Sequence, residues 1–205
     1  MAPKNQRWWL TEDSVELDID ADAEELYGMV SDLPRIGEWS PECEGVDWEG
    51  DVTVPVANTT FMGHNAVGPG RRIRYSRHGR VLVADPGREF TFITDEGGRE
   101  STVWRYRFEP LAGGRTRVTE SYEVRWIPTW ARILDVPTNR HKELLRGMRT
   151  TLDRLKAAAE ADHESGRVQL EPQDDARRQA AVVGYPRQRI SVSEHGRRRR
   201  REPAR

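Results

Sequence analysis

The stretch WRYRFEPLAGGRTRVTESYE, residues 104–123, predicts two adjacent strands joined by a hairpin turn. Polar and apolar side chains alternate on both sides of LAGG, which is the period of a strand with one buried face. LAGG itself is typical of the turn between antiparallel neighbours. The apolar face of the first strand carries Trp104, Tyr106 and Phe108, and that of the second, continued to residue 126, carries Val118, Tyr122, Val124 and Trp126.

Glu120 interrupts this pattern because it falls on the apolar side of the second strand. A carboxylate on a buried face loses its hydration unless a partner compensates it. The longest expected strand, residues 71–85, has a similar exception of opposite sign: Arg77 shares a parity with Ile73, Tyr75, Val81 and Val83.

Composition and charge separate a folded body from a tail. The chain has 205 residues, of which 36% are hydrophobic, so one domain with appendages can be built around a core. However, 33% of the residues are charged and the mean hydropathy is -0.83, which indicates that part of the chain is solvated. From residue 167 onward there are 11 Arg and 5 acidic residues, a net charge of +6, which leaves -7 for residues 1–166.

Several classes of protein are disfavoured by the motifs that the sequence lacks. No signal peptide and no run of about 18 apolar residues is present, so we expect a cytoplasmic protein without a transmembrane segment. Cys43 is the single cysteine, which excludes an internal disulfide and a cysteine-rich metal site. The five His have no metal-ligand spacing, and neither G-x-S-x-G nor H-E-x-x-H occurs. We therefore expect neither a metal nor a cofactor.

The order of expected elements is strand, two short helical segments, six strands and a long helix. Residues 21–32 form the first helix, and residues 36–42 form a second short turn of helix or a tight loop. The connections DPG, DEGG and LAGG predict an antiparallel sheet. After a Pro-punctuated link over 127–137, a helix is expected over 138–161, because Leu144, Leu145, Met148, Leu152, Leu155 and Ala159 recur at three and four. The expected strands cover residues 14–20, 43–50, 59–67, 71–85, 88–94, 101–111 and 116–126.

The domain organisation follows from where this periodicity begins and ends. We expect an N-terminal extension over residues 1–11, a folded domain over 12–161 and a disordered Arg-rich tail over 162–205. The block Arg197–Arg201 would bind polyanions weakly and with strong salt dependence. No folded nucleic-acid-binding motif occurs elsewhere, so no specific nucleic-acid partner is expected.

This order of elements resembles the START-like helix-grip superfamily, often called SRPBCC proteins. The segments VSDLPRIGEWSPECEGVDW, FMGHN, DPGREFTF and WRYRFEPLAGGRTRVTESYE, with the final helix, resemble its polyketide cyclase/dehydrase-like branch over residues 12–160. The resemblance implies an α+β fold in which a curved antiparallel sheet of about seven strands grips the C-terminal helix. It also implies a ligand cavity between the sheet and this helix.

Candidate site residues come from the inward parity of the strands and from the segments that carry the resemblance. Arg77 and Glu120 are each the lone charge on an apolar face, so we predict that they pair, either as a structural ion pair or as a ligand-facing one. Trp39 and Glu42 fall at the implied rim of the cavity, although a Trp in that place is also typical of a core. The full set of ligand-binding candidates is Trp39, Glu42, Phe61, Asn65, Tyr75, Arg77, Trp104, Tyr106, Glu120, Tyr122 and Met148.

Further polar residues have two readings each. Asn65 shares the parity of Phe61, whereas His64 falls on the other side and is expected at the surface. The three tyrosines of the set could present a hydroxyl to a ligand carbonyl or hydrogen-bond within the sheet.

Two functions fit these residues. The first is the binding of a small, largely apolar molecule, such as a lipid, polyketide or aromatic metabolite. The alternative is a polyketide cyclase/dehydrase-like enzyme, in which Arg77 would stabilise an enolate and Glu120 or a tyrosine would move the proton.

Overall fold

The computed structural model describes residues 11–182, with the side chains of residues 11–68, 70–133 and 139–161. The chain divides into two compact units, Met1–Gly166 and Arg167–Arg205, and the first contains the whole sheet. The predicted Arg197–Arg201 block and most of the predicted N-terminal extension lie outside the described residues. No helix within the described residues has the length and apolar character needed to span a membrane.

A seven-stranded antiparallel sheet forms the body of the first unit, in the order β1-β7-β6-β5-β4-β3-β2. Its strands are β1 (Glu12–Ile19), β2 (Cys43–Trp48), β3 (Thr60–Val67), β4 (Ile73–Asp85), β5 (Glu89–Glu96), β6 (Arg99–Pro110) and β7 (Thr116–Val124). Strands β2 to β7 pair in chain order, each with its sequence neighbour, and β1 pairs with β7. The hairpin predicted from residues 104–123 is β6 and β7, with Trp104 opposite Tyr122 and Tyr106 opposite Glu120.

The helices lie mainly at the two ends of the folded unit's sequence. They are α1 (Ala23–Ser31), the 3-10 helices η2 (Leu33–Glu38) and η3 (Pro69–Arg71), α2 (Thr129–Thr138) and α3 (Arg140–Val182). α1 begins at Asp22, whose side chain accepts a hydrogen bond from the backbone N–H of Glu24. The two short helices after the first strand are therefore present as predicted.

Two helical boundaries differ from the sequence prediction. Residues 129–138 form α2 where a link was expected, because Pro128 precedes the helix and its carbonyl accepts the N–H of Arg132. α3 ends at Val182, so this helix continues beyond residue 161, where the apolar period ends.

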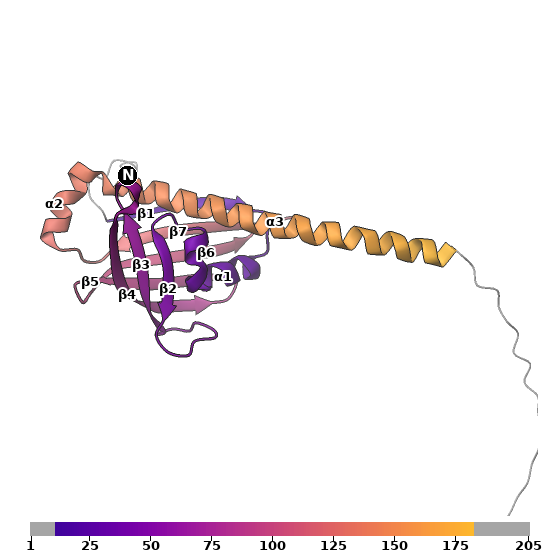
Figure 1. Ribbon diagram of the computed structural model, residues 1–205, viewed down its shortest axis with the longest axis horizontal. Helices are drawn as coiled ribbons and strands as arrows, with labels where there is room; N and C mark the ends of the chain where they lie inside the picture. The colour runs from indigo at the N-terminus through magenta and orange to yellow at the C-terminus, as the bar shows by residue number, and fades with distance from the viewer. Residues whose placement is uncertain (1–10, 183–205) are drawn as a thin grey trace, which may run out of the picture. The chain divides into compact units, whose positions relative to one another are not determined.

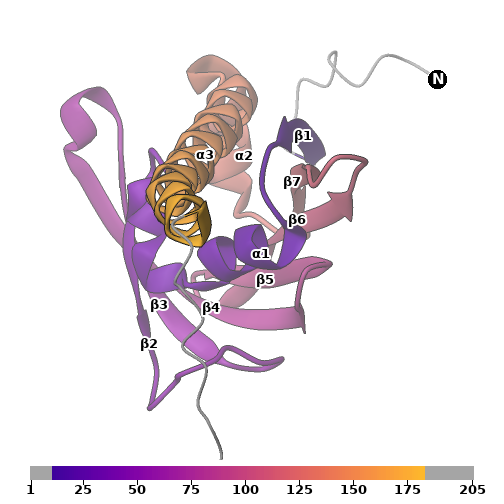
Figure 2. The same cartoon turned by 90° about the vertical axis from the view of Figure 1, so that its right-hand side faces the viewer.

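The sheet curves around the first turns of α3, with α1 on the same side (Figure 1, Figure 2). A single cluster of buried side chains, called the main core below, joins these elements. It includes Ile19, Leu26, Val30, Leu33, Ile36, Trp39, Phe61, Val81, Phe90, Phe92, Phe108, Val118, Leu152, Leu155 and Ala159. Apolar side chains of the sheet and of the helices are thus removed from water, and this burial is the main stabilising term for the fold.

Two local features of β4 control which side chains enter the core. Gly79 lies opposite Phe61, and a Cβ at this position would overlap the Phe61 ring. The pairing with β5 shifts between Val81 and Val83, so a bulge reverses the parity beyond Val81. Val83, predicted to face inward, is 37% exposed for this reason, and Ile73 at the start of the strand is 60% exposed.

Candidate functional site

Apolar residues under α3 form a second, smaller cluster beside the main core. Only Tyr122 and Met148 are fully buried there. Five partly buried side chains pack against them: Val15, Trp104, Val124, Leu144 and Leu145. We call these seven residues the helix-start cluster, because the members from α3 lie within its first turns. Five of its seven members are only partly buried, a larger share than in the main core, where seven partly buried hydrophobic residues surround twenty buried ones.

Glu120 borders the helix-start cluster on β7. It lies two residues from Tyr122 on the same face and opposite Val15 of β1. The side chain is 3% exposed, and one carboxyl oxygen accepts a 2.8 Å hydrogen bond from the hydroxyl of Tyr106. The other oxygen, Oε2, is buried and has no hydrogen-bond partner among the described residues. The sequence therefore predicted correctly that Glu120 points inward.

Burial dominates the ionisation of this pair. It raises the pKa of Glu120 to about 8, although the hydrogen bond from Tyr106 acts in the opposite direction. Burial, followed by the nearby charge of Glu120, raises the pKa of Tyr106 well above its ordinary value. At neutral pH both groups are consequently protonated, and the interior carries two neutral hydroxyl donors instead of a carboxylate.

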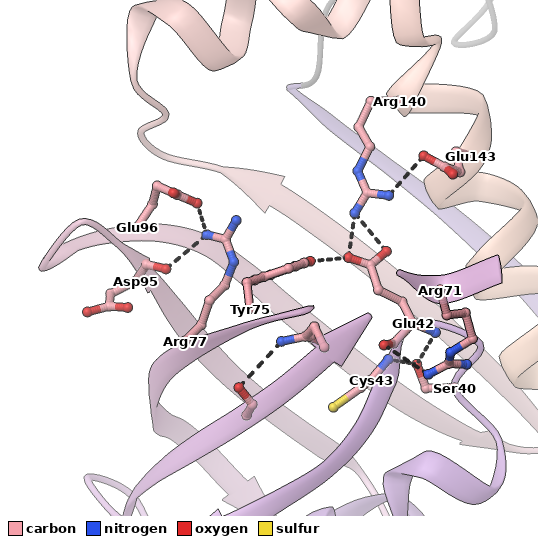
Figure 3. A network of polar contacts seen from close by, with 12 residues as sticks. Ser40, Glu42, Cys43, Arg71, Tyr75, Arg77, Asp95, Glu96, Arg140 and Glu143 are labelled. Carbon is pink, nitrogen blue, oxygen red and sulfur yellow. Dashed lines mark hydrogen bonds and ion pairs between the residues drawn. The ribbon is translucent and has the colours of Figure 1, made fainter. Parts of the chain in front are cut away.

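The predicted pairing of Arg77 with Glu120 is wrong. Arg77 forms an ion pair with Glu96 and donates a 3.0 Å hydrogen bond to the backbone carbonyl of Asp95 (Figure 3). Strands β4 and β7 are separated by β5 and β6, so three interstrand spacings of about 4.8 Å lie between them. Gly79 pairs with Thr94, and continuing this register by two residues places Arg77 level with Glu96. A cross-strand neighbour therefore compensates the arginine.

A polar network connects the start of α3 with the opposite part of the sheet (Figure 3). Arg140, the first residue of α3, donates to both carboxylate oxygens of Glu42, at 2.6 and 2.7 Å. Tyr75 of β4 donates its hydroxyl to the same carboxylate. The guanidinium of Arg77 lies 5.0 Å from the centre of the Tyr75 ring, which extends the network to β5. Glu42 and Tyr75, predicted independently, are thus brought together.

Electrostatics within this network favour the ion pair. Burial lowers the pKa of the Arg140 guanidinium, but the charge of Glu42 and its hydrogen bonds outweigh burial and raise that pKa above its ordinary value. Burial raises the pKa of Tyr75, and the adjacent carboxylate of Glu42 raises it further. Tyr75 therefore stays a hydroxyl donor, and the network ties α3 to β4 and to Glu42, the residue that precedes β2.

A third polar group joins β1, β7 and α3. The hydroxyl of Tyr122 lies 2.8 Å from Nδ1 of His141, and Nε2 of His141 lies 3.3 Å from Oδ2 of Asp13. The side chains of Asp13 and His141 are 7% and 12% exposed. Phenol, imidazole and carboxylate thus lie next to one another, in the order found in many acid–base sites. However, Nε2 of His141 and Oδ2 of Asp13 are both buried without a hydrogen-bond partner among the described residues.

Asp13, Arg140 and His141 were not predicted as site residues, although the sequence carries a signal for each. Asp13 has the same parity as Val15, Leu17 and Ile19, so it is a further charge on an inward face. His141 lies three residues before Leu144, so it extends the apolar stripe of α3 by about one turn towards the start of the helix. Arg140 adjoins this stripe. Extending both periods to the ends of their elements would have identified them.

The other candidates separate into core residues and residues near the network. Trp39, predicted at a cavity rim, is 2% exposed and belongs to the main core, as does Phe61. Asn65 is partly buried, and its amide lies 3.5 Å from the carbonyl of Gly63. His64 is at the surface as predicted, where its ring nitrogens lie close to Asp47 and Ser76.

Two surface pockets accompany these groups, but neither is the predicted cavity. One, of about 340 Å³, is lined by Glu44, His64, Asn65, Arg74, Tyr75 and Ser76. The other, of about 200 Å³, is lined by Glu12, Asp13, Ser14, Val103, Arg105, Ser121, Tyr122 and Glu123. Most of these residues belong to the side of the sheet that faces away from α3. Within the described part of the chain, no group of three or more His, Cys, Asp and Glu side chains is arranged to hold a metal ion.

A curved antiparallel sheet that grips a C-terminal helix is the helix-grip fold. Proteins with one fold can differ in function through the residues of their sites. The family model described as "Polyketide cyclase / dehydrase and lipid transport" matches residues 11–160, so the chain belongs to this family. No curated protein matches the sequence.

Solved structures agree with this assignment. The Polyketide_cyc-like protein Cgl2372 from Corynebacterium glutamicum is 29% identical, with a TM-score of 0.51 over 75% of this chain and 94% of that one. The Zhui aromatase/cyclase from Streptomyces sp. R1128 is 14% identical, with a TM-score of 0.57 over 73% and 93%. A START superfamily protein from Mycobacterium smegmatis is 15% identical, with a TM-score of 0.50 over 74% and 98%. The last two likenesses show the fold alone.

Proposed function

We propose that this protein binds a small, largely apolar molecule, such as a lipid, polyketide or aromatic metabolite, between the sheet and the first turns of α3. The observation that carries this proposal is the incomplete coverage of the helix-start cluster. A guest that packs against Trp104, Leu144 and Leu145 would remove their remaining apolar surface from water, at about 25 cal/mol for each Å² buried. Met148 suits such a site because its unbranched side chain adapts to different shapes.

A variant with a larger side chain at Met148 tests where the ligand binds. We expect the neutral dye Nile red to bind with enhanced fluorescence, and Met148→Trp to weaken binding at least about tenfold, because the larger ring occupies the guest's place. Met62→Trp is the matched control, since Met62 of β3 is on the opposite parity to buried Phe61 and is only partly buried. Thermal unfolding of both variants establishes that they are folded. Equal affinities of the two variants would contradict the proposed location.

A second experiment tests the class of ligand. Protein purified from its own host is extracted with organic solvent, and the extract is analysed by mass spectrometry. Under the proposal, an apolar small molecule is recovered in a roughly fixed ratio to the wild-type protein and is depleted from the Met148→Trp variant. A recovered molecule that is equally abundant in both preparations is not held at this site.

The line of Asp13, His141 and Tyr122 favours an acid–base enzyme as the second candidate. His141 is placed to exchange a proton with the hydroxyl of Tyr122, a member of the helix-start cluster, and Asp13 lies 3.3 Å from the other ring nitrogen of His141. A polyketide cyclase/dehydrase-like reaction requires such proton transfers. The test is turnover of a poly-β-ketone thioester: loss of product with His141→Asn and with Tyr122→Phe, while Nile red binding persists, supports the enzyme. Absence of turnover by the wild type leaves the binding function.

A further inference from the structure

Glu120 has one carboxyl oxygen that nothing in the described part of the chain satisfies. Tyr106 donates to Oε1 at 2.8 Å, whereas Oε2 is buried without a hydrogen-bond partner. Leaving a buried polar atom unpaired is costly, and folded proteins rarely do so without a functional reason. Because Glu120 borders the helix-start cluster, a guest bound there is the natural partner for this oxygen.

The surroundings of Glu120 contain no cation that would keep it charged. Its cross-strand neighbours are Val15 on β1 and Tyr106 on β6. Along β7, its neighbours on the same face are Val118 and Tyr122.

The other titratable groups nearby are Cys43 on β2, whose thiolate would raise the pKa of Tyr106, and the Asp13–His141 pair beyond Tyr122. Burial accordingly raises the pKa of Glu120 to about 8. At neutral pH the carboxyl is protonated, and since Tyr106 occupies Oε1 as a donor, the acid proton is available on Oε2.

We propose that Glu120 selects ligands whose inner end carries an uncharged hydrogen-bond acceptor, such as a ketone, aldehyde or ester carbonyl. This inference rests on the proposed binding function and names the chemistry of one end of the guest. A carbonyl oxygen satisfies the free donor. A carboxylate brings a second negative charge to a site without a cation, and a hydrocarbon leaves the donor unpaired, so both are disfavoured.

Three probes of similar length separate these possibilities: 2-undecanone, decanoate and undecane. Each is titrated against Nile red bound to the full-length wild-type protein at pH 7. We expect the ketone to displace the dye with an affinity about tenfold higher than undecane, and decanoate to bind most weakly. Between pH 7 and pH 9 the affinity for the ketone falls roughly tenfold as Glu120 loses its proton, whereas the affinity for undecane stays constant.

Substitutions at the same position identify the group responsible. Glu120→Gln places an amide donor where the acid proton was, so ketone selectivity persists but its pH dependence disappears. Glu120→Leu removes the donor, and the ketone then binds no better than undecane. The control is Glu123→Gln on the same strand, where the side chain is 50% exposed; it retains both the selectivity and the pH dependence.

The outcomes distinguish this inference from the proposed function. Equal affinities for ketone and hydrocarbon, or preferred binding of decanoate, would overturn the inference while leaving an apolar binding site in place. A pH dependence that survives in Glu120→Gln would assign the selectivity to another group. Failure of Nile red and of all three probes to bind would overturn the proposed function and this inference together.

Discussion

Glu120→Gln is expected to stabilise this protein, by an amount that grows with pH. In the folded chain, burial raises the pKa of Glu120 from an ordinary 4.5 to about 8. Folding therefore takes up a proton at every pH between these two values. The free energy of unfolding of the wild type falls by about 1.4 kcal/mol for each pH unit in this window.

The size of the effect follows from the width of the window. The stabilising contribution of the protonated carboxyl is fully present below pH 4.5 and is lost as pH rises through about 8. The total change is on the order of 5 kcal/mol, of which about 3 kcal/mol has accumulated at pH 7. Glutamine is neutral throughout and keeps an oxygen for the Tyr106 hydroxyl. The variant and the wild type should therefore have similar stability near pH 4.5 and diverge above it.

Urea unfolding followed by tryptophan fluorescence at pH 5, 6, 7, 8 and 9 measures this divergence. The informative quantity is the difference between variant and wild type at each pH, because other groups titrate equally in both. Glu123→Gln, an exposed change on the same strand, should differ from the wild type by no more than about 0.5 kcal/mol at any pH. A difference between Glu120→Gln and the wild type that is constant from pH 5 to 9 would refute the assignment of a neutral buried carboxyl.

Three further substitutions test the surrounding structure. Tyr106→Phe removes the hydrogen bond that lowers the pKa of Glu120. In this variant, the pH above which the free energy of unfolding stops falling should therefore lie above about 8, as measured by the same urea series. Glu42→Gln leaves Arg140 and Tyr75 without their carboxylate. Since the side chains of Arg140 and Glu42 are about a quarter exposed, we expect a loss of about 1–2 kcal/mol in the free energy of unfolding; no loss would mean that the network does not hold α3. Gly79→Ala forces a methyl group against the ring of Phe61 and should cost about 1–3 kcal/mol, measured by thermal unfolding, whereas an unchanged melting temperature would show that the strands can separate at this point.

Local periodicity in the sequence determined the order and type of most elements of this fold. Strand parity over residues 104–123 predicted the β6–β7 hairpin and the inward direction of Glu120, because a strand with one buried face repeats every two residues whatever its neighbours are. The apolar stripe that contains Met148 and Leu152 likewise predicted the helix that packs on the sheet. The polar direction of His64 followed from the same alternation.

Only the tertiary structure decided which charged groups meet. Arg77 and Glu120 obey the same parity rule, but two strands separate them, and the register of β4 against β5 assigns the arginine to Glu96. The bulge after Val81 reversed a parity that the sequence suggested was continuous, since one extra residue leaves no mark in the alternation of side chains.

The sites themselves are assembled from distant segments for the same reason. His141 reaches Asp13, and Arg140 reaches Glu42, because closure of β1 on β7 and the path of α3 bring both ends of the folded unit together. Burial likewise comes from the whole fold: Trp39 joined the core instead of a rim, and Glu120 became a neutral acid. A side chain's type and direction are local properties of the sequence, whereas its partner and its solvation depend on which distant segments pack over it.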